Sequence, residues 1–284
     1  MEETLQIEWN EPVVAVVGPP IVAGQLRIHQ LKSRVFGNRR MLRVWLPPGY
    51  DAPENRGRRY PVLYLNDGQN LFEASTSYTG VEWQVDESAA RLMHEGRIPP
   101  LVVVGIDNAR SERMREYVPY RSMDIPERRV EGKRYPEFLF DEVFPFIRKR
   151  YRVARGPENR GLGGSSLGAL ISLYTAITYP KEFGRLLLES PSLFVANRRL
   201  IRDSMRVRHW PQRVFLGIGT QETSDENRNR QVVDDVRSLA DVLQHAGLDA
   251  DRLKLDIDEG ANHSESAWAK RFPEALTFLY GERR

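Results

Sequence analysis

RGLGGSSLGALISLYTAITYP, residues 160–180, is the stretch that decides the fold of this chain. A short apolar run enters it, and the residues that follow place Leu170, Ile171, Leu173, Tyr174 and Ile177 on one face of a helix. The stretch therefore predicts a strand, a sharp turn and a helix, in that order.

The turn contains a G-x-S-x-G pattern at Gly164, Ser166 and Gly168. Such a turn forces its central residue into strained backbone angles and exposes the serine hydroxyl at a helix N-terminus. Free N–H groups and the helix dipole at that point favour an anion, which an attacked ester carbonyl becomes. The pattern makes Ser166 the candidate nucleophile; the alternative is a glycine-rich turn with a bystander serine.

Strand and helix patterns alternate along the rest of the chain. We expect strands at 61–66, 101–106, 160–164, 185–189, 213–218 and 253–257, and helices at 85–96, 135–151, 167–178, 230–245 and 268–279. Pro145 should kink the second of these helices. The alternation predicts an α/β fold in which a mainly parallel sheet carries helices on both faces.

The N-terminal part of the chain has a different pattern of apolar and polar residues. Residues 24–46 alternate between apolar and polar side chains around Gly37-Asn38, which predicts a β-hairpin. Residues 1–24 could form a short edge strand or an extended arm. The sequence shows no repeat or linker, so we expect one domain over residues 1–284.

Composition excludes several classes of protein. The 284 residues contain no cysteine, which removes disulfides, thiol catalysis and thiolate metal sites. The net charge is +3 and the basic residues are scattered among acids, unlike a nucleic-acid-binding surface. The acidic N-terminus and the absence of a long apolar run predict a cytoplasmic protein with no membrane partner. We expect no cofactor and no metal.

A serine nucleophile needs a histidine base, and the sequence offers five histidines. His263 lies in a polar segment between the last predicted strand and the last predicted helix, where catalytic groups gather in α/β folds. It is also the last candidate in the order serine, acid, histidine. We therefore expect His263 to be the base, and structural or solvated roles for the other four.

The acid that orients the histidine should lie between Ser166 and His263, at the end of a strand. Glu222 comes first after the predicted strand and a turn over residues 217–219, with Asp225 and Glu226 close behind. We favour Glu222, because the segment that carries Asp225 should be a mobile loop. Asp225 remains the alternative acid. A further alternative is that these acids lie in an exposed loop and have no catalytic role.

Two backbone N–H groups should hold the oxyanion. One is the N–H of Leu167, directly after Ser166. The other should come from the NDGQNLF segment at residues 66–72, where Gly68 lets the backbone approach closely and leaves Gln69 as the donor. A plain Asp-Gly turn is the equal alternative.

These motifs carry a family resemblance. LPPGYD near residue 50, YLNDGQNLF at 64–72, GGSSLGAL, ESPSLF at 189–194, GTQE at 219–222 and the GANHSESAWAKRFP segment stand in one order. Together they resemble the esterase family of α/β-hydrolases that includes esterase D-like proteins, enterochelin esterase-type siderophore hydrolases and feruloyl or acetylxylan esterases. The resemblance implies an α/β-hydrolase fold, with Ser166, His263 and Glu222 as the triad and Gln69 and Leu167 as oxyanion donors.

Several residues are candidates for substrate binding. Asn108 and Arg113 follow a predicted strand with Asp107, Glu116 and Tyr117 and should line the rim of the pocket. An ion pair between an Arg and a Glu there, tying the loop down, is the favoured alternative. The remaining candidates are Asn70 on the oxyanion segment and two aromatic wall residues, Phe194 and Trp83, although large aromatics more often belong to the core.

The sequence therefore predicts a serine carboxylic ester hydrolase that acts on a small-molecule ester, with aryl, sugar-linked and siderophore-type esters all open. An acyltransferase on the same scaffold is the alternative within enzymes, and a non-catalytic binding relative is the alternative outside them. A homo-oligomer is left open.

Overall fold

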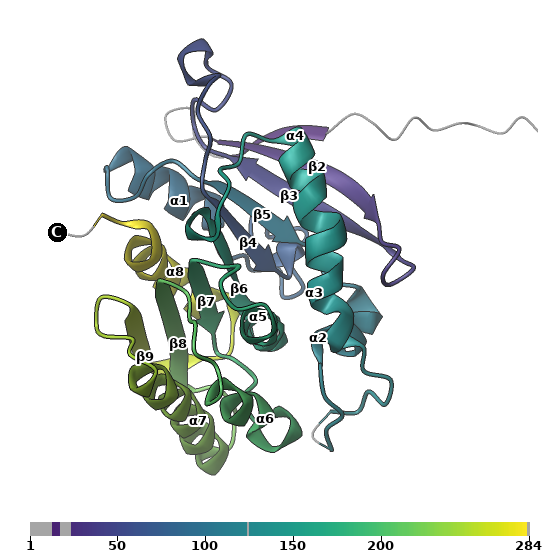
Figure 1. Cartoon of the computed structure of the whole chain (residues 1–284), viewed down its shortest axis with the longest axis vertical. Helices are drawn as coiled ribbons and strands as arrows, with labels where there is room; N and C mark the ends of the chain where they lie inside the picture. The colour runs from purple at the N-terminus through teal and green to yellow at the C-terminus, as the bar shows by residue number, and fades with distance from the viewer. Residues whose placement is uncertain (1–12, 18–23, 124, 283–284) are drawn as a thin grey trace, which may run out of the picture.

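A computed structural model describes residues 13–17, 24–123 and 125–282 (Figure 1). Over these residues the strands are β1 Val13–Val17, β2 Gly24–Lys32, β3 Arg39–Leu46, β4 Val62–Asn66, β5 Val102–Ile106, β6 Arg160–Ser165, β7 Arg185–Glu189, β8 Arg213–Gln221 and β9 Leu253–Asn262. The α-helices are α1 Val85–His94, α2 Arg113–Tyr117, α3 Tyr135–Phe138, α4 Phe144–Arg150, α5 Leu167–Thr178, α6 Val195–Ser204, α7 Glu226–His245 and α8 Glu265–Tyr280.

The described strands form one sheet of nine, in the order β1-β2-β3-β5-β4-β6-β7-β8-β9. The strands from β5 to β9 in that order are parallel, and β1, β2 and β3 add to the sheet in antiparallel fashion. The predicted α/β fold with its N-terminal hairpin is confirmed. The carboxyl ends of β6, β7, β8 and β9 are therefore neighbours along one edge, which is where an open α/β sheet places its ligands.

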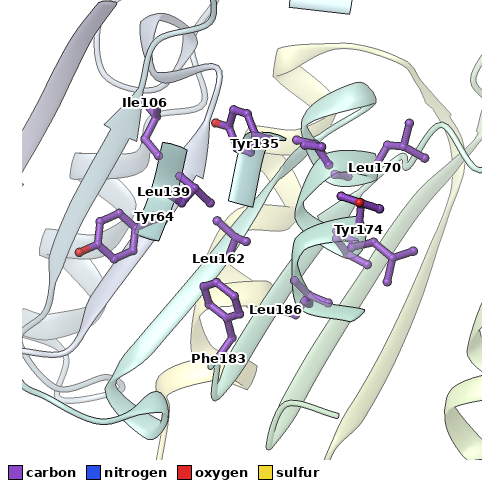
Figure 2. Close-up of a cluster of buried hydrophobic side chains, with 14 of the residues drawn as sticks. Tyr64, Ile106, Tyr135, Leu139, Leu162, Leu170, Tyr174, Phe183 and Leu186 are labelled. Atoms are coloured by element: carbon purple, nitrogen blue, oxygen red, sulfur yellow. The ribbon is translucent and has the colours of Figure 1, made fainter. Parts of the chain in front are cut away.

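Both faces of the sheet are covered, and the alternation of side chains along β4 shows why. Val62 and Tyr64 join the core on the face covered by α3, α4, α5, α6 and α7, whereas Leu63 and Leu65 join the core under α1 and α8. Successive residues of a strand point to opposite faces, so a fully apolar strand must be buried on both. Figure 2 shows part of the first core, in which Leu162 of the sheet lies between Tyr64 on one side and Leu170 and Tyr174 of α5 on the other.

The N-terminal segment contributes an edge strand rather than a free arm over the residues that are described. β1 pairs with β2 from Val13↔Ile28 to Val17↔Gly24. Residues 1–12 and 18–23 of the predicted arm or strand lie outside the described residues.

The helix expected at 135–151 is present with an irregular middle. α3 and α4 are joined by a π-helical turn, Leu139–Val143, and Pro145 stands in the first turn of α4. Proline has no N–H to donate, so the regular hydrogen-bond ladder is interrupted one turn before it. The irregularity that the structure places next to Pro145 is therefore a π turn.

Two strands run further than expected. β8 continues to Gln221, with a register irregularity between Gly219 and Gln221, where we expected a turn over residues 217–219. β9 continues to Asn262. Pairing between Gln221 and Asn262 extends both strands beyond their apolar stretch, and the expected turn is wrong because backbone pairing needs no apolar side chains.

Candidate active site

Ser166 occupies the sharp turn between β6 and α5. Its backbone angles are φ 55° and ψ −123°, a conformation that a side chain rarely adopts. A Cβ at Gly168 would lie 2.8 Å from Asp67 Oδ2, and one at Gly164 would lie 3.1 Å from Asn66 Cβ. Both glycines of the motif are thus required by the close approach of the β4 end, and Ser166 is left half-buried at the start of α5.

Asn66, the last residue of β4, holds this turn in place. Its buried amide donates to the carbonyl of Gly168 (3.0 Å) and to Ser172 Oγ (2.9 Å). The hydroxyl of Tyr135 donates to Asn66 Oδ1 (2.5 Å), so the amide is fully occupied. Because every polar atom of the amide has a partner, Asn66 fixes β4, α3 and the first turn of α5 relative to one another.

His263 follows β9 directly, so a strand end positions it rather than the polar loop that we expected. Its Nδ1 lies 2.5 Å from Glu222 Oε2, and Glu222 itself is the residue directly after β8. The histidine side chain is 36% exposed and the glutamate side chain 4% exposed. The two strands are neighbours in the sheet, so their ends bring the predicted base and acid together.

The second carboxylate oxygen of Glu222 is also occupied. Oε1 accepts hydrogen bonds from the backbone N–H of Gly219 and from Ser190 Oγ, both at 2.7 Å. Burial raises the pKa of Glu222, but the hydrogen bonds from His263, Ser190 and Gly219 outweigh burial and lower the pKa below its usual value. Glu222 is therefore held as a carboxylate next to the imidazole.

Behind Glu222 lies a contact that the sequence analysis missed. Trp268 Nε1 donates to Ser190 Oγ (2.9 Å), and the indole ring meets the ring of His263 edge to face, with centroids 5.0 Å apart. Ser190 is buried, with a φ of 43°. The ESPSLF and ESAW segments contain both residues, but only the pairing of β7 with β8 shows that Ser190 reaches Glu222.

The position of Asp225 differs from our expectation of a mobile loop. Its side chain accepts from the N–H groups of Asn227 and Arg228 and caps α7, which begins four residues earlier than expected. The expectation was wrong because Asp followed by a polar helix start is an N-cap signal. The carboxylate of Asp225 is committed to the helix, whereas that of Glu222 contacts His263.

The nucleophile candidate and the base candidate are not hydrogen-bonded in this structure. Among the described residues, Ser166 Oγ has its contact with Ser192 Oγ, at 3.3 Å. Hydrogen bonds between catalytic groups are often long or absent before substrate binds. Ser192, from the loop after β7, is a further residue that the sequence analysis did not single out.

The predicted oxyanion segment forms a short 3₁₀ turn, Gly68–Asn70, directly after β4. A Cβ at Gly68 would lie 2.5 Å from the carbonyl carbon of Gly105, so this glycine lets the turn pack against β5. The N–H groups of the first residues of a helix have no partner inside it, and both Gln69 and Leu167 are at such positions. The side chain of Gln69 accepts from the N–H of Asn108 (3.1 Å), which ties the turn to the end of β5.

Asp67 connects this turn to the rim, and it is a residue that sequence reasoning missed. It adopts a left-handed conformation with φ 59°, and its carboxylate receives two hydrogen bonds from Arg113, both of 2.7 Å. Asn108 Nδ2 donates to the same carboxylate (2.7 Å). Arg113 and Asn108, expected at the rim, therefore donate hydrogen bonds to the predicted oxyanion segment.

The ion pairs of the rim have other partners than expected. Arg113 pairs with Asp67, and Glu116 pairs with Arg40 at 2.6 Å in a fully buried contact. These contacts agree with the favoured role, in which ion pairs tie the loop down, but the pairing of Arg113 with Glu116 is wrong, because Asp67 after β4 and Arg40 of β3 lie closer to them. Such pairs hold the loop to the sheet.

The other substrate-binding candidates are placed as follows. The amide of Asn70 donates to Glu265 Oε1 (3.2 Å) and accepts from the N–H of Tyr78 (3.1 Å). Phe194 is half-buried, with the guanidinium of Arg228 over its ring at 5.1 Å. Trp83 is 2% exposed and packs against Trp268 and Phe272, so it belongs to the core as the alternative reading held.

The fold and this arrangement of strand ends define an α/β-hydrolase of the esterase type. The chain belongs to the family described as "Putative esterase", whose model matches residues 33–279. The family resemblance stated from the motifs is thus confirmed.

Similarity to individual proteins agrees with that assignment. The chain is 30% identical over 259 residues to the uncharacterized protein YbbA of Bacillus subtilis (strain 168), which covers 89% of this chain and 97% of that protein. It is 26% identical over 256 residues to an endo-1,4-beta-xylanase/feruloyl esterase of Xylanibacter ruminicola, covering 87% of this chain and 30% of that protein. A solved structure of the enterobactin esterase FES from Shigella flexneri superposes with a TM-score of 0.69 at 18% identity, covering 93% of this chain and 60% of that one, and shows the shared fold.

In the part of the chain that the structure describes, no helix is long and apolar enough to cross a membrane.

Proposed function

We propose that this protein hydrolyses carboxylic esters through an acyl intermediate on Ser166, with His263 as general base and Glu222 as the acid that orients it. The observation that carries the proposal is the contact between Glu222 and His263 at the ends of two adjacent strands, on the same edge of the sheet as the strained turn of Ser166. Membership in the esterase family supports ester hydrolysis as the reaction.

The reaction follows from these positions. Ser166 Oγ leaves its contact with Ser192 and gives its proton to His263 Nε2 as it attacks the ester carbonyl. The N–H groups of Leu167 and Gln69 receive the negative charge that develops on the carbonyl oxygen. His263 then returns the proton to the leaving alcohol, and a water molecule, deprotonated by the same imidazole, releases the acid from Ser166.

Glu222 has two roles in this scheme. Its contact with Nδ1 requires a proton on that nitrogen, so Nε2 is free to accept one from Ser166. Its negative charge stabilises the imidazolium that forms. The hydrogen bonds from Ser190 and Gly219 keep the carboxylate ionised and immobile while it does so.

A phosphonate that reacts with active serines tests the proposal together with a short-chain aryl ester. Turnover of the ester, with labelling at Ser166 and no labelling of the Ser166→Ala variant, is the expected result. Labelling with transfer of the acyl group to an added alcohol in preference to water would favour the acyltransferase. The absence of both labelling and turnover would leave the non-catalytic binding protein as the better account.

The candidate substrates are aryl, sugar-linked and siderophore-type esters. One relative is named a feruloyl esterase and one structural neighbour an enterobactin esterase, which supports testing these classes first. Feruloyl esters, acetylated sugars and a serine trilactone should be compared by kcat/KM. A preference of at least about tenfold for one class would assign it, since that ratio corresponds to one well-made polar contact.

A further inference from the structure

Two adjoining hollows lie along α6, on the face of the sheet that α5 covers. Their volumes are about 870 and 620 Å³, and both contact Tyr120, Lys133 and Arg199, so they form one continuous groove. We call it the α6 groove. The residues that line it come from α6 and from the chain that follows α2, and Figure 1 shows these two segments next to each other at the lower end of the view.

The α6 groove concentrates positive charge. Seven Arg and Lys side chains of its described lining stand against two acids, Glu131 and Asp203, an excess of five, whereas the whole chain has a net charge of +3. Five of the seven have no ion pair with a described residue: Arg121, Lys133, Arg202, Arg206 and Arg208. The basic residues that look scattered in the sequence are therefore collected by the fold.

Both acids of the groove already interact with other side chains. Glu131 pairs with Arg115, outside the groove, at 2.9 Å and only at 3.6 Å with Arg134. Asp203 accepts from the hydroxyl of Tyr120 (2.8 Å) and pairs with Arg199 (3.2 Å). Cations that repel one another around a hollow are stabilised when a negatively charged ligand enters it.

One wall of the groove starts at the proposed nucleophile. Ser192 Oγ contacts Ser166 Oγ, and Ala196, four residues further, lines the groove. Four residues of chain span at most about 14 Å, which limits the distance between the two sites. The N–H of Ala196 donates to Ser122 Oγ on the opposite wall (2.9 Å) and so joins the walls near this end.

The other wall starts at the oxyanion segment. The hydroxyl of Tyr117 accepts a hydrogen bond from the N–H of Asp67 (3.3 Å), and Tyr120, three residues further, is the aromatic residue shared by both hollows. The ring of Tyr120 meets that of Tyr174 edge to face, which gives the groove an apolar floor. Both walls thus extend from elements of the proposed active site.

The wall on α6 also contains strained backbone. Ala196, Asn197 and Arg198 have φ values of 52°, 52° and 60°, a left-handed turn built without glycine. Arg198 is held there by an ion pair with the buried Asp235 (2.5 Å). Strain of this kind is found where function requires a particular backbone shape, and here it shapes the groove lining at Ala196 and Asn197.

We propose that the α6 groove binds a carboxylate or phosphate group of an elongated ester substrate whose ester bond lies at Ser166. The inference rests on the proposed function, and it adds that the substrate is an anion whose charge is separated from the ester by a spacer. Arg121 and Lys133 are the cations best placed to test it, because neither has an ion pair with a described residue.

The test compares matched neutral and charged esters. The substrates are the 4-nitrophenyl monoesters of suberic and succinic acid, with 4-nitrophenyl octanoate and butyrate as their neutral counterparts. The proteins are the wild type, the double variant Arg121→Gln/Lys133→Gln and a control, Arg56→Gln/Arg59→Gln, which removes two exposed cations far from α6 in the sequence. Binding of pyrophosphate is measured by calorimetry on the same proteins.

We expect the wild type and the control to prefer the suberate ester over octanoate by about tenfold in kcat/KM, mainly through KM, with no such preference for the short succinate. The groove variant should lose this preference and its affinity for pyrophosphate, while its rate on the neutral esters stays unchanged. An equal suberate preference in the groove variant and the wild type would overturn the inference, as would a wild type without that preference. A different outcome would overturn the proposed function itself. In that case the protein would hydrolyse no ester and would not react with the phosphonate, but it would still bind pyrophosphate through Arg121 and Lys133. The groove would then be an anion site that does not serve an ester substrate.

Discussion

Ser166 is the residue whose role the sequence indicates most directly. Its two flanking glycines are needed because the ends of β4 and β6 approach closely, and this need is visible in the G-x-S-x-G pattern without a structure. Ser192 could not be found in the same way. It lies in a loop after β7, and only the parallel pairing of β6 with β7 brings its hydroxyl to 3.3 Å from Ser166 Oγ.

Replacement of Ser166 by Ala should abolish ester hydrolysis and leave the fold intact. The side chain is half-buried and its hydroxyl has one long contact, so little packing is lost. We expect kcat to fall by about 10³ or more, measured with an aryl ester, because a triad member acts as part of a unit. The neighbouring Ser165→Ala is the control; if it were the inactive variant, the register of the turn would be misassigned.

Glu222→Gln should lower kcat by about 10² to 10⁴, because the amide cannot stabilise the imidazolium and favours the wrong tautomer of His263. Asp225→Asn should change kcat little, since asparagine also caps a helix. The two variants are compared by kcat on one ester and by circular dichroism for folding. A larger loss from Asp225→Asn than from Glu222→Gln would contradict the assignment of the acid.

At the scale of elements, the proposed acid, Glu222, is held by a hydrogen-bond network that joins β7, β8 and α8. Trp268 from α8 donates to Ser190 after β7, and Ser190 donates to Glu222 after β8. The sequence predicts each of these elements from its own periodicity. It does not predict the network, because hydrogen bonds between the ends of different strands depend on sheet order, which periodicity does not contain.

Ser190→Ala should therefore lower kcat about tenfold, because a hydrogen bond to a carboxylate is lost. The same change removes one of the hydrogen bonds that lower the pKa of Glu222, so the part of the acidic limb of the pH–rate profile that reflects protonation of Glu222 should lie at a higher pH in the variant than in the wild type. Trp268→Phe leaves the bond between Ser190 and Glu222 in place and should shift the pH–rate profile less. An unshifted profile for Ser190→Ala would mean that Ser190 has only a packing role.

The lengths of β8 and β9 show where sequence prediction ends. Their apolar cores were predicted, but both strands continue through polar residues to Gln221 and Asn262, and this extension is what carries Glu222 and His263 to the same place. Helix α7 shows the opposite case. Its N-cap at Asp225 is a local signal that the sequence contains and that an expectation of a loop overlooked.

At the scale of the whole molecule, a buried ion pair lies beneath the site. Glu189, the last residue of β7, is fully buried, and its Oε2 accepts from Arg271 Nε (2.9 Å) and Nη2 (2.8 Å) of α8. Its Oε1 has no partner among the described residues. Burial raises the pKa of Glu189 to about 7 in spite of Arg271, because an unpaired carboxylate oxygen in the core is poorly solvated.

This pKa predicts how stability depends on pH. The folded chain keeps a proton on Glu189 between the unfolded pKa, near 4.5, and about 7, so the free energy of unfolding should decrease as pH rises through that range. A shift of this size corresponds to ~3 kcal/mol for a fully buried group. Glu189→Gln removes the titration, so the stability of the wild type relative to this variant should fall by about that amount between pH 5 and pH 8.

This difference is measured by urea unfolding of the two proteins at a series of pH values. The control is Glu182→Gln, at an exposed glutamate that pairs with Arg160, and the stability of the wild type relative to this control should not change with pH. The variant keeps the shape of the side chain, and Arg271 retains Asp258 at 3.5 Å, so the glutamine protein should fold. A relative stability of the wild type that stayed constant or rose with pH would show that Glu189 is ionised throughout. In that case Arg271 would outweigh burial, and the pair would act as a permanent electrostatic link between β7 and α8 rather than as a group that titrates near neutrality.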